Sequence, residues 1–332
     1  MNDYLKSVEW LLNSKDPSVR YLTLTDIEGK SEASEEVKKI RERIVDGEKV
    51  RALLSGQNVD GGFSVHPYRK WTGSHWRLVS LVNLALLNDN PRAIKSAKLS
   101  LDWLYSSGID RSFKEKNGKV RMHASVYGNA VYYFCYFGLA EEPRVKKIIG
   151  LIQKSQWEDG GWNCDPNPEA THSSFHESLA TLNGLIAYYN ITRDKFVKKS
   201  IDKAADLFLS HHIFKSHHSG KIIMKEWLKL RYPVYWHYNF LEAMRVLCLA
   251  GKGSDDRMED SLDLLEKKCD SDGRWTVEGH YWSPIEKNYL STSKSLPSRE
   301  VVDWGWIGPN EMITLNALRV LKATGRVPKG MI

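Results

Sequence analysis

A chain of 332 residues with 42% hydrophobic residues and 12 tryptophans has ample material for a large core. Its net charge of +7 is mild, and its lysines and arginines are spread along the chain, which argues against nucleic acid as a partner. No apolar run reaches membrane-spanning length, although peripheral contact with a membrane stays open. The first residues lack the pattern of a signal peptide, so we expect a cytoplasmic protein.

The apolar periodicity predicts an all-α chain. In chain order, helices are expected at residues 3–13, 17–28, 35–54, 75–87, from Pro91 onward, and at 123–137, 143–155, 175–189, 194–211, 237–250, 257–268 and 310–322. Helices with a single apolar stripe, such as 143–155, alternate with helices that are apolar on nearly every face, six of each kind.

This alternation favours a single domain over residues 1–332, an (α/α)6 toroid of six outer and six parallel inner helices. Residues 1–55 would complete the ring, and residues 56–325 would form a repeat region. The connections from outer to inner helices are long, and long loops in compact domains are usually functional. We therefore expect a working mouth at the end where the inner helices begin.

A glycine turn recurs with one spacing. The three copies are Gln57, Gly61 and Phe63; Gln156, Gly160 and Trp162; and Cys269, Gly273 and Trp275. Copies about two periods of 50 to 56 residues apart indicate an internal repeat. After the middle copy, Ser174 is expected to cap a helix, with Glu177 as its capping-box partner.

These turns and alternating helices resemble the QW-type repeats of the terpenoid cyclase and protein prenyltransferase superfamily. More narrowly, the segments RYPVYWHYNFLEAMRVL, SSFHESLATLNGL and NALRVLK look like bacterial and archaeal proteins labelled squalene-cyclase-like or prenyltransferase-like. The resemblance covers residues from about 50 to 325 and implies the toroidal fold, but a fold alone does not fix a reaction.

The catalytic motifs of that superfamily are missing. No Asp-x-Asp-Asp motif occurs, and the nearest acidic run, around Asp255 and Asp256, is expected to cap an outer helix. The zinc-binding Asp and Cys of prenyltransferases would fall near Thr171 and Ser173. Zinc held by Cys164, Asp165 and either His237 or His176 is an alternative, so we expect no cofactor, with zinc as the minor case.

The cysteines show no metal or disulfide spacing. Cys135, Cys164, Cys248 and Cys269 form no CxxC pair, and two of them fall within predicted buried helices. We expect reduced thiols.

Histidines mark the predicted mouth. His75, His123, His172, His176 and His237 lie at or near the starts of successive inner helices. The candidate catalytic residues are His75, His123, His176, Glu177, His237 and Glu311. Together they offer either an acid and base pair or a metal site of imidazoles and carboxylates. A single histidine at a helix start usually has a structural role, so the prediction depends on their convergence.

Aromatic and basic side chains surround the same helix starts. The candidate substrate-binding residues are Trp71, Trp76, Tyr127, Phe175, Arg231, Trp236, Tyr238, Trp304 and Trp306. Aromatic walls suit isoprenoids and carbocations, and they equally suit sugar rings or simple core packing. Six helix N-termini at one mouth would also favour an anion such as a diphosphate.

Three functions follow from these observations. The first is an enzyme or binding barrel for an isoprenoid or similar lipid in a central cavity. The second is a carbohydrate-active (α/α)6 enzyme, a lyase, epimerase or hydrolase, for which a polar groove would be evidence. The third is a non-catalytic binding module, for which a filled centre would be evidence.

Overall fold

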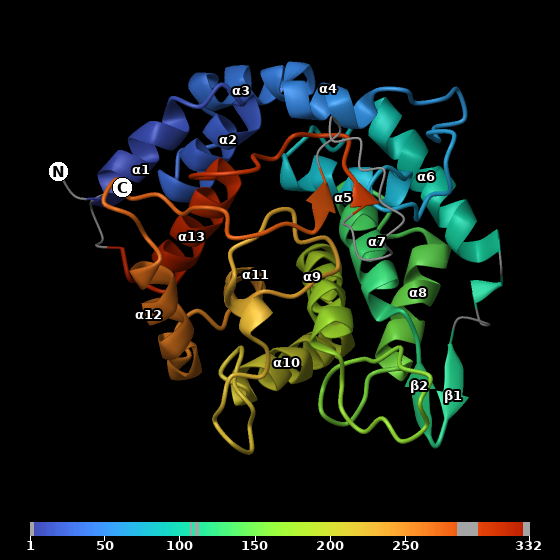
Figure 1. The fold of residues 1–332 in the computed structure, drawn as a ribbon. Helices are drawn as coiled ribbons and strands as arrows, with labels where there is room; N and C mark the ends of the chain where they lie inside the picture. Colours follow the sequence, from blue (N-terminus) through green and yellow to red (C-terminus); the bar gives the residue numbers. More distant parts are fainter. Residues whose placement is uncertain (1–2, 107, 110–112, 284–297, 328–332) are drawn as a thin grey trace.

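The protein is mostly helical, with 54% helix and 4% strand. A computed structural model describes residues 3–106, 108–109, 113–283 and 298–327 (Figure 1). No helix within these ranges is long and apolar enough to cross a membrane.

The helices follow the chain in pairs. The first half contains α1 (Asp3–Leu12), α2 (Pro17–Leu22), the π-helical turn η1 (Thr23–Ile27), α3 (Glu35–Glu42), the 3-10 turn η2 (Arg43–Asp46), α4 (Glu48–Leu54), α5 (Ser74–Asn83), α6 (Pro91–Ser106), α7 (Ala124–Tyr136) and α8 (Pro143–Lys154). The second half contains α9 (Phe175–Thr192), α10 (Lys195–Ser210), the 3-10 turn η4 (Lys225–Leu228), α11 (Phe240–Leu249), the 3-10 turn η5 (Asp256–Met258), α12 (Glu259–Lys267) and α13 (Glu311–Ala323).

Strands are short and peripheral. The hairpin of β1 (Lys114–Lys116) and β2 (Lys119–Arg121) is antiparallel, with Glu115 opposite Val120. The pair of β3 (Trp282–Ser283) and β4 (Ser298–Arg299) is parallel. The all-α prediction is therefore confirmed at the level of class.

Most predicted helices are present, and three differ in detail. The predicted helix 35–54 is divided at Gly47, whose extended backbone (φ −60°, ψ 141°) ends η2 and begins α4. The predicted helix 17–28 changes from α to π geometry at Thr23. The predicted helix 237–250 begins only at Phe240, because Asn239 caps it by accepting a hydrogen bond from the Glu242 amide.

The chain passes once around the molecule, from α1–α4 through α5–α8 and α9–α10 to α11–α13 (Figure 1). The last helix, α13, packs against α1, α2 and α11, while α9 packs against α7, α10 and α11. One cluster of buried apolar side chains extends from Val8 in α1 to Val327 after α13. Both the N-terminal helices and the repeat region therefore contribute to the same core.

The closest helix contact is between α7 and α9. A Cβ atom at Gly184 would lie 2.2 Å from the Gly128 carbonyl oxygen, and one at Gly128 would lie 2.4 Å from the Thr181 Cα. These two glycines allow the backbones to touch, which any side chain would prevent. The contact brings the backbones of α7 and α9 together.

The three glycine turns share their hydrogen bonds. The amides of Asn58, Trp157 and Asp270 each donate to the carbonyl four residues later, at 2.8, 2.9 and 3.0 Å. The indole Nε1 of Trp162 donates to the Ile152 carbonyl (2.9 Å), and that of Trp275 donates to the Leu265 carbonyl (2.8 Å). Each indole thus adds a second donor to a carbonyl in the last turn of the preceding helix, α8 or α12, which also accepts the amide of the residue that caps or follows the helix.

Gly160 shows why the turn needs glycine. Its φ is +98°, and a Cβ there would lie 2.3 Å from the Lys203 carbonyl of α10. The turn therefore packs directly on the backbone of the next outer helix.

Candidate functional site

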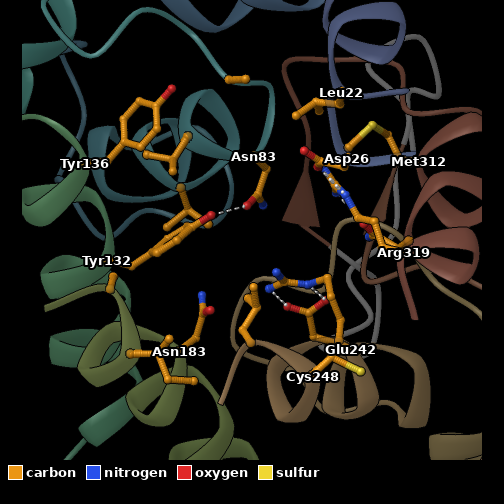
Figure 2. A pocket seen from close by; sticks show the side chains of 18 of the residues that line it. Leu22, Asp26, Asn83, Tyr132, Tyr136, Asn183, Glu242, Cys248, Met312 and Arg319 are labelled. Atoms are coloured by element: carbon orange, nitrogen blue, oxygen red, sulfur yellow. Dashed lines mark hydrogen bonds and ion pairs between the residues drawn. The ribbon is translucent and has the colours of Figure 1, made fainter. Parts of the chain in front are cut away.

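A central cavity of about 600 Å³ lies among the helices that are apolar on most faces (Figure 2). Its volume falls within the range of small-molecule sites. The lining side chains come from α2, η1, α3, α5, α7, α9, α11 and α13, together with the loop that precedes α3 and the segment that precedes α11. Helices far apart in the sequence therefore share one cavity.

Amide and phenol groups dominate the polar part of its wall. The lining includes five asparagines and five tyrosines: Asn83, Asn129, Asn183, Asn190 and Asn316, and Tyr21, Tyr132, Tyr136, Tyr232 and Tyr235. Within the described part of the chain, no tryptophan, histidine or lysine side chain lines it. The wall thus offers hydrogen-bonding groups without a free ammonium group or an indole surface.

Two of these polar groups lack a protein partner. Tyr132 Oη donates to Asn83 Oδ1 at 3.1 Å, but Tyr232 Oη is buried without a hydrogen-bond partner among the described residues. The buried Asn183 amide likewise makes no side-chain hydrogen bond within those residues, and Figure 2 shows it directed into the cavity. Tyr232 Oη is one of several buried polar atoms in the described residues that have no protein partner, and a water molecule or a ligand would satisfy it.

Each arginine that lines the described wall is paired with a carboxylate. Arg245 binds Glu242 through two hydrogen bonds of 2.6 and 2.9 Å, and Arg319 binds Asp26 at 2.5 Å. Arg41 is bonded to Glu32. Burial opposes the charge of Arg245, but Glu242 outweighs it and raises the pKa of the guanidinium. These arginines and carboxylates thus leave the described lining without net charge.

The cavity opens where α9, α11 and α13 end. Asn190, Leu249 and Ala323 line it from the last turns of α9, α11 and α13, and all three residues are exposed. At the level of the helix starts, Tyr235 closes it, because its ring stacks on the buried Trp71 at a centroid distance of 4.1 Å. The opening is therefore at the opposite end from the predicted mouth.

The predicted site residues lie elsewhere, since none of them lines the cavity. His75 is fully buried, and its Nδ1 lies 3.1 Å from the Tyr133 hydroxyl. Burial lowers the pKa of His75 to about 3. A catalytic base works best with a pKa near the operating pH, so this imidazole fits a packing role better.

His176 and His237 do come together, but within a layer of stacked rings. Their centroids are 6.4 Å apart, and His237 stacks between Trp236 (4.2 Å) and Tyr281 (3.6 Å). Burial lowers the pKa of His237 to about 3 and also lowers the pKa of His176. These histidines are neutral members of an aromatic layer at the helix starts.

The remaining predicted binding residues also pack. Phe175 stacks on Trp227 (4.7 Å) and contacts Tyr238 (5.1 Å), while Trp76 contacts His75 (4.5 Å). Further pairs are Tyr127 with Phe113, Arg231 with Glu226 and Tyr281, Trp304 with Tyr232, and Trp306 with His280. Glu311 begins α13 outside the cavity wall, and His172 is exposed in the loop before α9.

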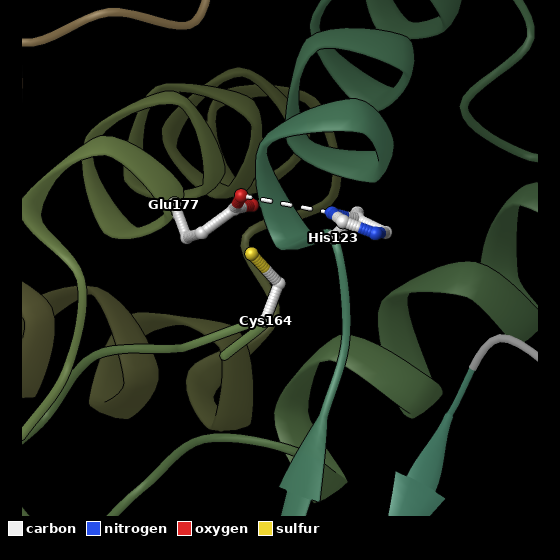
Figure 3. A group of neighbouring side chains, drawn as sticks. All are labelled: His123, Cys164 and Glu177. Carbon is white, nitrogen blue, oxygen red and sulfur yellow. Dashed lines mark ion pairs between the residues drawn. The ribbon is translucent and has the colours of Figure 1, made fainter. Parts of the chain in front are cut away.

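Two of the predicted catalytic residues, His123 and Glu177, lie beside Cys164, one of the candidate zinc ligands. The side chains of His123, Cys164 and Glu177 place their ligand atoms within 4.8 Å of one another (Figure 3). His123 is exposed before α7, Cys164 is half-buried in the loop after the glycine turn, and Glu177 is buried in the first turn of α9. The predicted zinc partners differ: Asp165 is exposed and binds the Asn167 amide, and His237 lies in the aromatic layer.

Only one of the two hydrogen bonds of the capping box predicted for Ser174 and Glu177 is present. Ser174 caps α9 by accepting from the Glu177 amide at 3.4 Å, as expected. The Glu177 carboxylate does not return to Ser174, however, because its Oε2 accepts the Ser125 amide of α7 at 2.7 Å. Glu177 therefore caps the neighbouring helix, whose own N-cap, His123, makes no side-chain capping bond.

The cluster shifts the pKa of two of its members. The neighbouring Cys164, and then Glu177, raise the pKa of His123 to about 10. Burial acts to raise the pKa of Glu177, but the nearby His123 and the hydrogen bond from the Ser125 amide outweigh it and lower that pKa.

Comparisons with known proteins identified no relative of this chain. No protein-family model matches the chain, and no curated protein or solved structure matches it either.

Some of the cavity residues could have been recognised from the sequence. Asn83, Asn129, Asn183 and Asn316 stand one each in α5, α7, α9 and α13, within helices that are otherwise largely apolar. Asparagine is a weak helix former, and inside a buried helix its amide needs a partner. The recurrence of asparagine in these four helices was the available signal.

Proposed function

We propose that the helices form an (α/α) toroid whose central cavity binds a small, uncharged, hydroxyl-bearing molecule of the glycan class. The observation that carries the proposal is the lining of five asparagines and five tyrosines. Amides present a donor and an acceptor side by side, and phenols do both through one oxygen, which suits vicinal hydroxyl groups. The Tyr232 hydroxyl, which has no partner among the described residues, and the Asn183 amide, which points into the cavity, are groups that a ligand would satisfy.

Charge balance supports an uncharged ligand. A diphosphate or uronate site needs cationic groups that are not already neutralised. Here Arg41, Arg245 and Arg319 are each engaged by a carboxylate. The diphosphate expected from the predicted mouth therefore has no counterpart in the described wall.

The same pairing favours binding over hydrolysis. A glycosidase needs a carboxylic acid that is free to protonate the leaving oxygen and a second carboxylate facing it. Glu242 and Asp26 instead hold arginines. We assign recognition without hydrolysis to the cavity.

A second candidate is an isoprenoid or similar lipid, the ligand class that the family resemblance implies. Aliphatic side chains also line the cavity, among them Val79, Val82, Ile186 and Val320. They would pack against a hydrocarbon chain, with the amides at its polar end. The lack of tryptophan or phenylalanine in the described lining makes this the weaker candidate, because carbocation and isoprenoid sites favour such rings.

Isothermal titration separates the two candidates. Maltose, cellobiose and chitobiose represent neutral glycans, and farnesol and geranylgeraniol represent isoprenoids. We expect a saturable heat with at least one saccharide and none with the alcohols. Binding of farnesol without any saccharide would refute the proposal in favour of the lipid, and binding of neither set would refute both.

Tyr232→Phe refines this experiment. Removing a buried hydroxyl that has no partner among the described residues should leave the free protein as stable or slightly more stable. It should weaken saccharide binding by about tenfold, the effect of one lost hydrogen bond. Unchanged affinity would show that the ligand does not reach this hydroxyl.

A further inference from the structure

We propose that His123, Cys164 and Glu177 form a zinc site with one open coordination position. The three residues offer an imidazole nitrogen, a thiol sulphur and a carboxylate oxygen within 4.8 Å of one another. None of them lines the central cavity, so this site is separate from the proposed ligand site.

The backbone holds the cluster in place. The Met122 amide donates to the Asn163 carbonyl at 3.1 Å, which fixes the residue before His123 against the residue before Cys164. The Asn163 side chain donates to the His172 carbonyl at 2.7 Å and closes the loop from the other side. Two ligands distant in sequence are thus aligned by main-chain contacts, as a preformed site requires.

Glu177 is oriented as a metal-binding carboxylate would be. Its Oε2 accepts the Ser125 amide at 2.7 Å, and its Oε1 lies 4.0 Å from His123 Nδ1. One oxygen is therefore held by the protein and the other faces the cluster (Figure 3). Hydrogen bonds that fix a ligating carboxylate are a regular feature of metal sites.

The donor set selects the metal. Bond lengths of about 2.0–2.3 Å place ligand atoms roughly 3.3–3.7 Å apart around tetrahedral zinc. The ligand atoms must therefore move closer than their present separation of up to 4.8 Å. Rotation of the exposed His123 and half-buried Cys164 side chains can bring them that close. Sulphur and imidazole favour zinc over magnesium or calcium, which take oxygen ligands.

Three protein ligands leave a fourth position for water. Such sites are reactive, because zinc activates its bound water as a nucleophile, whereas structural zinc sites are closed by four ligands. Since the His123 side chain is 75% exposed, the cluster can be reached from solvent. A substrate for this site would therefore approach from outside the helical bundle.

These ligands are not those that the superfamily resemblance implies. In that pattern the aspartate and cysteine would fall near Thr171 and Ser173. Here the cysteine stands two residues after Trp162, and the histidine precedes an earlier inner helix. The cluster is specific to the way this chain folds.

The test uses the full-length protein, stripped with a chelator and titrated with Zn²⁺ against a chromophoric competitor, and with Co²⁺ by absorption. We expect one equivalent of zinc and a thiolate-to-cobalt charge-transfer band. Cys164→Ser and Glu177→Gln should each weaken zinc binding by about 100-fold or more, since even outer-shell changes cost 10–100-fold. Glutamine keeps an oxygen for the Ser125 amide, so this variant retains the cap of α7.

Cys248→Ser and His218→Ala are the matched controls, because Cys248 lines the cavity and His218 is exposed in another loop. Both should keep the stoichiometry and the cobalt band. The proposal is overturned if the stripped protein takes up no zinc, if Cys164→Ser binds as tightly as the parent, or if His218→Ala abolishes binding. Saccharide titration of Cys164→Ser should be unchanged, so failure here leaves the cavity proposal standing.

Discussion

The two ends of the cavity-lining helices use their side chains differently. At the helix starts, His176, His237 and Trp236 lie in a closed layer of rings. Toward the helix ends, Asn183 and its counterparts line an open cavity. Residue types that are common in active sites thus pack the fold, while less conspicuous amides form the wall that a ligand can reach.

The largest expected effect on stability comes from a substitution in the aromatic layer at the helix starts. Phe175→Ala should lower the free energy of unfolding by about 3–5 kcal/mol, because it removes a ring packed against Trp227 and Tyr238. Phe196→Ala is the control, since Phe196 is 72% exposed and its loss should cost less than about 0.5 kcal/mol. Urea denaturation measures both. Equal costs would show that the aromatic layer does not stabilise the fold.

Glu300 lies between the two regions, and its burial leads us to expect a pH dependence of the free energy of unfolding. Tyr235 donates to this buried carboxyl, and burial raises its pKa from 4.5 to about 8. The folded protein then keeps a proton that the unfolded chain releases, so stability should fall as pH rises from about 4.5 to about 8.

Glu300→Gln should remove this component. The unfolding free energy of the variant minus that of the parent should grow by roughly 3–5 kcal/mol across that window and stay constant above it. Denaturation at a series of pH values gives this difference directly. The pH-dependent contribution of the histidines is the same in both proteins and drops out of the difference. A constant difference throughout would contradict the raised pKa.

Asn183→Leu tests the open region. The substitution keeps the side-chain size and removes the amide, so saccharide affinity should fall by about tenfold while stability changes by less than about 1 kcal/mol. Asn88→Leu is the control, because Asn88 is exposed outside the cavity. Titration calorimetry reports the ratio. Tighter binding of farnesol to the Asn183→Leu variant than to the parent would favour the lipid candidate.

His237→Phe has the smallest expected effect at neutral pH. The ring still stacks on Trp236 and Tyr281, so stability should change by less than about 1.5 kcal/mol. The depressed pKa of His237 makes its contribution complete above about 6.5 and progressively lost toward about 3. The variant should therefore gain about 2 kcal/mol relative to the parent on going from neutral pH to pH 5. Loss of saccharide binding in this variant would place the ligand at the helix starts instead.

The sequence predicted the elements because their signals are local. Apolar stripes marked the helices, Gly160 marked a turn that needs positive φ, and Ser174 marked a cap. The site depends on contacts between distant segments, which periodicity does not reveal. We expected the imidazoles to converge at the helix starts, but the sequence pattern did not reveal that His75 is fully buried.

The His123 cluster shows the same limit. Cys164 was a candidate ligand from sequence, but its partners depend on the hydrogen bond from Met122 to Asn163 and on the direction of Glu177 across to α7. Neither is visible along a single helix. The zinc and cavity hypotheses consequently rest on three-dimensional observations.

Side-chain NMR with the tightest-binding saccharide tests the central claim most directly. We predict that the Nδ2 signals of Asn83, Asn129, Asn183 and Asn316 shift on titration, while the imidazole signals of His75, His176 and His237 do not move. Shifts confined to those imidazoles, with the four amides unchanged, would contradict the account.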